Sequence, residues 1–324
     1  MMRQIIVTST GGPEVLSLRQ VPVPAPKPDE IRIRLVAAGL NFIDVYHRTG
    51  LYPVPLPSGL GLEGAGIVEA IGKDVTRFQV GDRAAFCSGP LGAYADFACV
   101  SQGRAVHVPG GIDLEIAAAS LLKGLTAEFL VRQLVPLSAG DIVLFHAAAG
   151  GVGLLACAWL AYKGVTIIGT VGSPEKAALA KQHGCTHTIL YRDEDVASRV
   201  RALTNGKGCK VVFDSVGADT FTASLDSAAR RGLVVSFGNA SGSPAPFAPS
   251  ELARRGSLMF TRPTLFDFIN STEALDHAAE ALFALILDGT LQPHIGARFA
   301  LEDAAHAHRN LEVRQTTGST IFVM

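Results

Sequence analysis

The sequence predicts an α/β protein in which a doubly wound parallel sheet is inserted into a β-rich domain. Apolar strand-like runs alternate with helix-like segments between residues 141 and 239, and the chain on either side carries short strand-like runs. Such an alternation is typical of a parallel sheet covered on both faces, and the fixed hand of its crossovers favours a doubly wound order. We place the β-rich domain at 1–124 and 262–324 and the inserted domain at 125–261.

The N-terminal segment has the pattern of short strands. Ile31, Ile33 and Leu35 alternate with two arginines, which is the period of a strand with one buried face. The stretch from Pro22 to Pro28 is too rich in proline for a helix or a central strand, so we expect an extended surface connection. Glycines between 59 and 72 separate short apolar runs, which indicates a barrel-like domain with tight turns.

The C-terminal segment returns to a mixed pattern. Apolar residues from 275 to 286 fall at helical spacing, and Gly289 ends the predicted helix. Strand candidates at 295–299 and 320–323 flank a second predicted helix near 302–311. This tail resembles the first segment more than the middle one, which is why we assign it to the β-rich domain.

Composition and charge exclude several classes of protein. The 324 residues are 48% hydrophobic and 18% charged, which indicates a globular protein with room for two domains. The net charge of −1 gives no basic face for nucleic acid or for an anionic membrane. No apolar run reaches the length of a membrane span. The five cysteines form no close pair, so we expect reduced thiols and a cytoplasmic location.

The most informative stretch is IVLFHAAAGGVG, where a strand from Ile142 to His146 runs into a glycine-rich turn and a helix. A dinucleotide pyrophosphate needs bare backbone N–H groups at a helix N-terminus. Gly150 and Gly151 permit that close approach, and Gly153 permits the helix to pack tightly on the strand. Ala148 stands where the usual pattern has its first glycine, and a purely structural turn is the alternative; we favour a dinucleotide site.

The next strand, from Val165 to Val171, favours NADP over NAD. An NAD enzyme usually has an acidic residue at the end of this strand, whereas here Gly172 and Ser173 follow. Lys176 offers a cation, Ser173 a hydroxyl, and Tyr191 after the following strand can close a 2′-phosphate site. The alternative is that the lysine is an ordinary solvated surface charge.

Several further motifs occur in a fixed order, and together they resemble the quinone oxidoreductase branch of the medium-chain dehydrogenase/reductase superfamily. The motifs are GPEVL (12–16), NFIDVYHRTGLYP (41–53), GLEGAGIVEAIG (61–72), KGLTA (123–127), HAAAGGVG (146–153), DSVG (214–217), VSFGN (235–239) and TRPTL (261–265). The resemblance covers essentially the whole chain. It implies a GroES-like catalytic domain, an inserted Rossmann domain, NADPH as cofactor and a homodimer.

The resemblance also implies the site residues. The catalytic candidates are Asn41, Tyr46 and Tyr52, with Tyr52 facing the substrate cleft. The cofactor-binding candidates are Asn41, Phe42, Asp44, Tyr46, Thr126, Phe129, Gly150, Gly151, Val152, Gly172, Ser173, Lys176, Tyr191, Val216, Phe237, Gly238, Asn239, Ser241, Arg262, Thr264 and Arg314. Tyr52 has an alternative role as a packing residue.

The sequence argues against a metal. A catalytic zinc needs about three protein ligands. In the zinc-dependent branch a cysteine occupies the place of Asn41, and a histidine the place of Leu62, directly before the residue that matches Glu63. His306 and His308 are two positions apart, which directs them to different faces of a helix. We therefore predict no metal site.

These observations predict an enzyme that reduces quinones with NADPH and without zinc. Tyr46 and Tyr52 are candidates to donate hydrogen bonds to the substrate oxygen or to stack on a flat ring, and no residue is an obvious acid or base. One alternative is a reductase of other activated C=C bonds, such as enones or enoyl thioesters. Another is a non-enzymatic NADPH-binding redox sensor or structural protein. The expected partner is a small quinone or enone, with no nucleic acid and no membrane.

Overall fold

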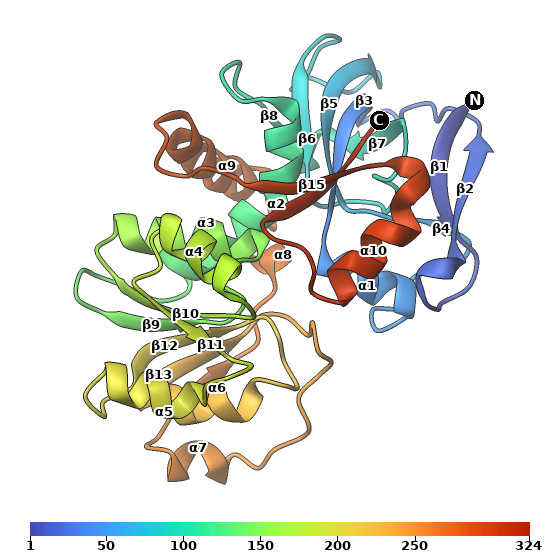
Figure 1. The fold of residues 1–324 in the computed structure, drawn as a ribbon. Helices are drawn as coiled ribbons and strands as arrows, with labels where there is room; N and C mark the ends of the chain where they lie inside the picture. Colours follow the sequence, from blue (N-terminus) through green and yellow to red (C-terminus); the bar gives the residue numbers. More distant parts are fainter. The chain divides into compact units, whose positions relative to one another are not determined.

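Residues 1–324 are all described by the computed structural model in Figure 1, and they form two units. Unit 1 comprises Met1–Leu125, Phe268–Gly289 and Pro293–Met324, and unit 2 comprises Thr126–Asp267 and Thr290–Gln292. The main part of unit 2 is therefore an insertion in the sequence of unit 1. Two helices cross the unit boundaries, α2 (Leu114–Glu128) and α8 (Leu265–Phe268).

Unit 1 is built mainly from antiparallel strands. Its strands are β1 (Met2–Val7), β2 (Leu16–Val21), β3 (Glu30–Leu40), β4 (Ser58–Gly59), β5 (Glu63–Ile71), β6 (Arg83–Phe86), β7 (Phe97–Ser101), β8 (Ala105–His107), β15 (Ile295–Ala300) and β16 (Ser319–Val323). Its helices are α1 (Phe42–Thr49), α9 (Thr272–Leu287) and α10 (Ala304–Glu312), with short 3-10 turns at Pro13–Val15, Gln102–Arg104 and Leu301–Asp303. Residues 22–28 form neither helix nor strand, as their prolines predicted.

A seven-stranded sheet organises unit 1. Its order is β15-β16-β3-β5-β6-β8, with β7 paired to β3, and a small sheet β2-β1-β4 lies apart from it. The alternation predicted for β3 is confirmed, because Ile31 and Ile33 are fully buried. The C-terminal strand β16 pairs antiparallel with β3, with Phe322 opposite Ala38, so the C-terminal segment shares a sheet with part of the N-terminal segment (Figure 1). This pairing explains why the tail resembles the first segment.

Unit 2 contains a six-stranded parallel sheet. Its strands are β9 (Ile142–Phe145), β10 (Thr166–Val171), β11 (His187–Leu190), β12 (Cys209–Asp214), β13 (Ala228–Ser236) and β14 (Met259–Thr261). Its helices are α3 (Gly151–Tyr162), α4 (Pro174–Gln182), α5 (Val196–Leu203), α6 (Phe221–Ser227) and α7 (Ser250–Arg254), with a π-helical turn at Phe129–Gln133. In Figure 1, α3 and α4 cover one face of the sheet, and α5 and α6 cover the other.

The strand order β11-β10-β9-β12-β13-β14 is that of the Rossmann fold. Numbered along the chain, it reads 3-2-1-4-5-6, and every pairing is parallel. The predicted fold class is confirmed. In such a sheet the order reverses between the first and fourth strands, here β9 and β12, and ligands bind beyond the carboxyl ends of the strands at that point.

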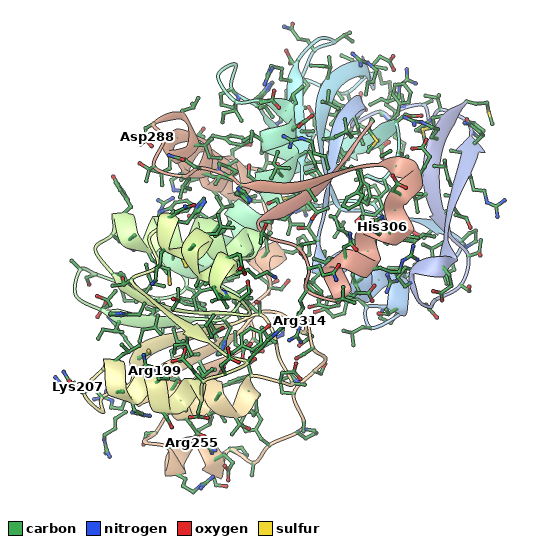
Figure 2. The ribbon with its side chains drawn as sticks, viewed as in Figure 1. Arg199, Lys207, Arg255, Asp288, His306 and Arg314 are labelled. Carbon is green, nitrogen blue, oxygen red and sulfur yellow. The ribbon has the colours of Figure 1, made fainter.

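Helix α10 shows why two nearby histidines have different environments. Figure 2 shows His306 on this helix, where the side chain is exposed and its ring lies 5.5 Å from that of Phe299. His308 is fully buried and its Nδ1 lies 3.1 Å from the guanidinium of Arg48 on α1. The two histidines occupy different faces, as their spacing predicted. None of the helices is both long and apolar enough to span a membrane.

Candidate functional site

The turn between β9 and α3 is the centre of the site in unit 2. Ala147 has a left-handed backbone conformation, with φ of 54°, although it is not a glycine. The main-chain N–H of Ala148 donates to Thr170 O at 3.1 Å, and the N–H of Gly150 donates to Ala147 O at 2.9 Å. These bonds fold the turn on itself before the helix begins at Gly151.

The first turn of α3 offers N–H groups to a ligand. The N–H groups at the start of a helix have no intrahelical acceptor, and they carry the positive end of the helix dipole. Gly150 is the N-cap residue and has no side chain that could satisfy them. The helix starts at the carboxyl end of β9, beside the reversal of strand order. This arrangement fits a pyrophosphate.

The glycines of the turn have different neighbours. A Cβ on Gly153 would lie 2.5 Å from Ala147 O, so only glycine permits the observed packing of α3 on the turn, as predicted. A Cβ on Gly150 would meet only Ala147 O, at 3.2 Å. Ala148 replaces the usual first glycine, and Gly169 on β10 makes room for it, because a Cβ there would lie 2.7 Å from the Ala148 methyl group.

The end of β10 groups four of the predicted residues. Ser173 caps α4, and its Oγ accepts a hydrogen bond from the main-chain N–H of Lys176 at 3.3 Å. Tyr191 lies against Gly172, where an added Cβ would be 2.8 Å from the phenolic oxygen. Glu175 is on the helix and exposed. A hydroxyl, a lysine and a phenol thus come from residues at or beside the position where an NAD enzyme carries an acid.

The loops after β12 and β13 are joined by main-chain hydrogen bonds. The N–H of Ser241 donates to Val216 O at 2.7 Å, and Ser241 Oγ donates to the same carbonyl at 2.9 Å. A Cβ on Gly238 would lie 2.5 Å from Ser215 O, so this loop also depends on glycine. The ring of Phe237 lies 5.9 Å from that of Phe145 at the end of β9.

Three other predicted residues of unit 2 are located by a single hydrogen bond or by their burial. Arg262 donates to the carbonyl of Ser236 at 3.1 Å, which holds it near the end of β13. Phe129 is buried in the π-helical turn and Thr126 is buried in α2. The structure therefore gathers the predicted residues that follow β9, β10, β12 and β13 at one edge of the sheet.

In unit 1 the predicted residues cluster around α1. Asn41 is the N-cap residue, and its main-chain N–H donates to Asp44 Oδ2 at 2.9 Å. The ring of Tyr46 lies 6.3 Å from that of Phe42 and 5.2 Å from that of Tyr52. Tyr46 is buried and Tyr52 is half-buried.

Arg314 also belongs to unit 1. It lies two residues after the end of α10, with a left-handed φ of 59°, and Figure 2 labels its side chain.

A buried ion pair fixes the side chain of Asn41. Glu63 is fully buried, and its Oε2 accepts from Asn41 Nδ2 at 2.8 Å and from Lys123 Nζ at 3.1 Å. Asn41 Nδ2 also lies 3.4 Å from Gly39 O, so its N–H groups face inward. A carboxylate only accepts hydrogen bonds, which sets the orientation of the amide. Asn41 can therefore offer a ligand its amide oxygen, an acceptor.

Asp44 has an unusual titration. Complete burial raises the pKa of its carboxyl group to about 7, although hydrogen bonds from Tyr94 and from the Asn41 main chain oppose the shift. The phenol of Tyr94 donates to Asp44 Oδ2 at 2.7 Å. Sequence analysis did not single out Glu63, Lys123 or Tyr94 as site residues. A lysine within the apolar helical run AAASLLKGLTA is the signal that it could have used.

Known proteins resemble the chain along its full length. A model of the alcohol dehydrogenase GroES-like domain matches residues 27–110, and a model of zinc-binding dehydrogenases matches residues 151–284. Quinone oxidoreductase from Pseudomonas aeruginosa is 54% identical over the whole of both chains. The chain belongs to the quinone oxidoreductase family.

Two further relatives bear on the chemistry of this quinone oxidoreductase family member. The crystal structure of Escherichia coli quinone oxidoreductase complexed with NADPH is 43% identical, with a TM-score of 0.98, and the match covers 99% of this chain and 100% of the other. A 2-haloacrylate reductase from Burkholderia is 40% identical and covers 100% of this chain and 99% of its own length.

The name of one matching model implies zinc, but the residues here do not fit a catalytic zinc. Asn41 and Leu62 stand at two of the expected ligand positions, and neither is a useful zinc ligand. Glu63, the carboxylate directly after Leu62, already accepts from three donors, one of them the ammonium group of Lys123. That cation would repel a metal ion beside it.

Proposed function

We propose that this protein is an NADPH:quinone oxidoreductase that acts without zinc. The observation that carries the proposal is the edge of the unit 2 sheet, where the bare first turn of α3 follows β9 and Ser173 and Lys176 follow β10. The first feature suits a pyrophosphate and the second suits a 2′-phosphate. A relative with a TM-score of 0.98 has been crystallised with NADPH.

We assign the predicted site residues to two tasks. The residues of unit 2 at the ends of β9, β10, β12 and β13 would hold the dinucleotide. The nicotinamide ring supplies the hydride when NADPH is bound. Asn41 would present its amide oxygen to an N–H or O–H group of the ligand. Tyr46 and Tyr52 would donate a hydrogen bond to the quinone oxygen, or stack on its ring, as charge develops on that oxygen.

The domain division, assembly and location of the protein follow as parts of the same proposal. We assign substrate chemistry to the GroES-like domain, residues 1–124 and 262–324, and cofactor binding to residues 125–261. All five cysteines are free thiols, which suits a reducing cytoplasm. A homodimer is expected from the family resemblance, and the oligomeric state is measured by light scattering of the purified chain.

The second candidate is a reductase of other activated C=C bonds. The 40% identity to a 2-haloacrylate reductase over the whole chain favours it. Enones and haloacrylates share with quinones a conjugated carbonyl or carboxylate group that takes up charge after hydride addition. The same hydrogen-bond donors would therefore serve both classes of substrate.

A substrate panel separates these functions. Oxidation of NADPH is followed at steady state with ortho- and para-quinones, short enones and 2-chloroacrylate, after removal of metals with a chelator. Turnover of quinones at a higher kcat/KM than the others supports the proposal. A preference for enones or for chloroacrylate would replace it with the second candidate. Tight NADPH binding without any turnover would indicate a binding protein, and activity that requires added zinc would contradict the metal-free chemistry.

A further inference from the structure

His146 lies at the end of β9, directly before the pyrophosphate turn, and its side chain is fully buried. Both ring nitrogens have partners. Nδ1 lies 3.1 Å from Thr170 Oγ1 on β10, and Nε2 lies 3.0 Å from Ser224 Oγ on α6. The ring thus connects two elements on opposite sides of its strand.

The direction of each hydrogen bond follows from the chemistry of the groups. Ser224 Oγ lies 2.6 Å from Asp214 Oδ2, and a carboxylate can only accept, so the serine hydroxyl donates to it. The serine oxygen must then accept from His146, which places the imidazole proton on Nε2. Burial lowers the pKa of His146, so its ring is neutral and Nδ1 accepts from the hydroxyl of Thr170.

The chain of hydrogen bonds ends on the main chain of the turn. Thr170 Oγ1 lies 3.3 Å from the main-chain N–H of Ala147 and accepts from it. Ala147 is the residue with φ of 54°, a conformation that costs a non-glycine residue about 1 kcal/mol. Its carbonyl accepts from Gly150 and contacts the position that Gly153 leaves empty. The conformation of Ala147 therefore determines where α3 begins.

The other end of the chain holds the turn after β12. Asp214 Oδ1 accepts from the main-chain N–H groups of Val216 at 2.8 Å and Gly217 at 3.1 Å. The donors run without a break from Ala147 N–H through Thr170 to His146, and from His146 through Ser224 to Asp214. Hydrogen bonds in such a chain polarise one another inside a protein. One buried network therefore connects the turns that follow β9 and β12, the strands between which the strand order reverses.

We infer that His146, Thr170 and Ser224 are positioning residues for the dinucleotide, which hold the turn after β9 in the shape that binds its pyrophosphate. This inference rests on the proposed function and adds to it three residues that touch no ligand. Because the pyrophosphate is common to both cofactors, the network affects NADPH and NADH equally. In this it differs from Lys176, whose proposed partner is the 2′-phosphate.

The central experiment replaces Thr170 by valine, which keeps the shape of the side chain and removes the hydroxyl. We expect the KM and Kd for NADPH to rise about tenfold, the loss expected when a buried donor loses its acceptor. The KM for NADH should rise by the same factor, and kcat should stay within about twofold. Thr170→Ser keeps the hydroxyl and should restore affinity. Thr166→Val, at the opposite end of the same strand, is the matched control and should change nothing.

A second variant tests whether the network acts as a unit. Ser224→Ala removes the link between His146 and Asp214. If the chain is cooperative, the Thr170→Val and Ser224→Ala double variant should lose no more NADPH affinity than the weaker-binding single variant. Losses that multiply would overturn the cooperative part of the inference.

The ring proton is measured directly in the unmodified protein by nitrogen-15 NMR of the histidines. We expect a neutral His146 protonated on Nε2 at neutral pH, and a proton on Nδ1 would overturn the inference even if the variants fail to fold. A Thr170→Val variant that melts at a lower temperature but binds NADPH normally would show a merely structural role and would also overturn it. If the unmodified protein binds no NADPH, the proposed function itself fails, and the inference fails with it.

Discussion

The ammonium group of Lys123 lies 3.1 Å from the carboxylate of Glu63, and their side chains are only 7% and 0% exposed. This ion pair anchors the amide of Asn41. Glu63 also accepts from the main-chain N–H of Leu122 at 2.7 Å, so the carboxylate joins β5 to α2. The pair is thus a structural element of unit 1 and the support of a predicted site residue.

Replacing Lys123 by methionine should destabilise the fold, because it leaves the buried carboxylate of Glu63 without a counter-charge. We expect the free energy of unfolding in urea to fall by about 3 kcal/mol. The double variant Lys123→Met with Glu63→Gln should regain most of that loss. Lys210→Met is the control, because its pair with Asp141 is partly exposed and should cost under about 1 kcal/mol. Equal losses for the two lysines would contradict the argument.

The buried carboxyl group of Asp44 should make stability depend on pH. Its folded pKa, about 7, lies above the ordinary pKa of 3.8, so between these values the folded state binds a proton that the unfolded chain lacks. Its contribution is fully present below the unfolded pKa and is lost as pH rises through the folded pKa, by at most about 1.4 kcal/mol per pH unit. Asp44→Asn cannot ionise, so the stability of the native protein relative to this variant should decrease between pH 5 and pH 7. Parallel curves would show that Asp44 titrates normally.

Lys176 should discriminate between the two cofactors. Lys176→Ala removes the cation near Ser173 and should raise the KM for NADPH by about tenfold or more, since a charge-assisted bond to phosphate is lost. The weak use of NADH should change little. Lys181→Ala, near the other end of α4, is the control and should leave both KM values unchanged. If the KM values for NADPH and NADH rose by the same factor, Lys176 would not bind the 2′-phosphate.

Substitutions at two glycines of the turn after β9 should affect NADPH binding and folding differently. Gly150→Val places its side chain over the start of α3 with little internal contact, and its φ of −80° is accessible to valine. The protein should fold, but saturating NADPH should no longer raise its melting temperature. Gly153→Ala should instead lower the free energy of unfolding by about 2 kcal/mol, because the new methyl group would overlap Ala147 O. A Gly150→Val protein that NADPH still stabilises would argue against the site.

Much of the fold could be predicted because its patterns are local. The alternation around Ile31 and Ile33 reports one buried face of a strand, and the strand-turn-helix before Val152 has a recognisable spacing. The predicted tail strands at 295–299 and 320–323 correspond to β15 and β16. The order of the motifs along the chain was specific enough to indicate the family, which the 54% identity to a full-length relative confirms.

The network of His146 could not be predicted, because its members come from four separate elements. In the sequence, Thr170 and Ser224 are 24 and 78 residues from His146, and Asp214 is 10 residues from Ser224. No sequence pattern around a threonine in a strand or a serine in a helix identifies its buried hydrogen-bond partner. The raised pKa of Asp44 could not be predicted either, because it arises from the burial that the surrounding elements impose.

The amino-acid sequence by itself determined the class of this protein and the glycine-rich turn after β9, and it predicted a preference for a phosphorylated dinucleotide, since each depends on residues close together in the chain. Only the tertiary structure decided which polar groups are buried together. It orients the Asn41 amide so that its oxygen can accept a hydrogen bond, and it pairs Glu63 with Lys123. It also decides which ring nitrogen of His146 donates and which accepts. The physical reason is that burial makes every unpaired charge or hydrogen-bonding group costly, and partners for such groups are chosen by distance in space.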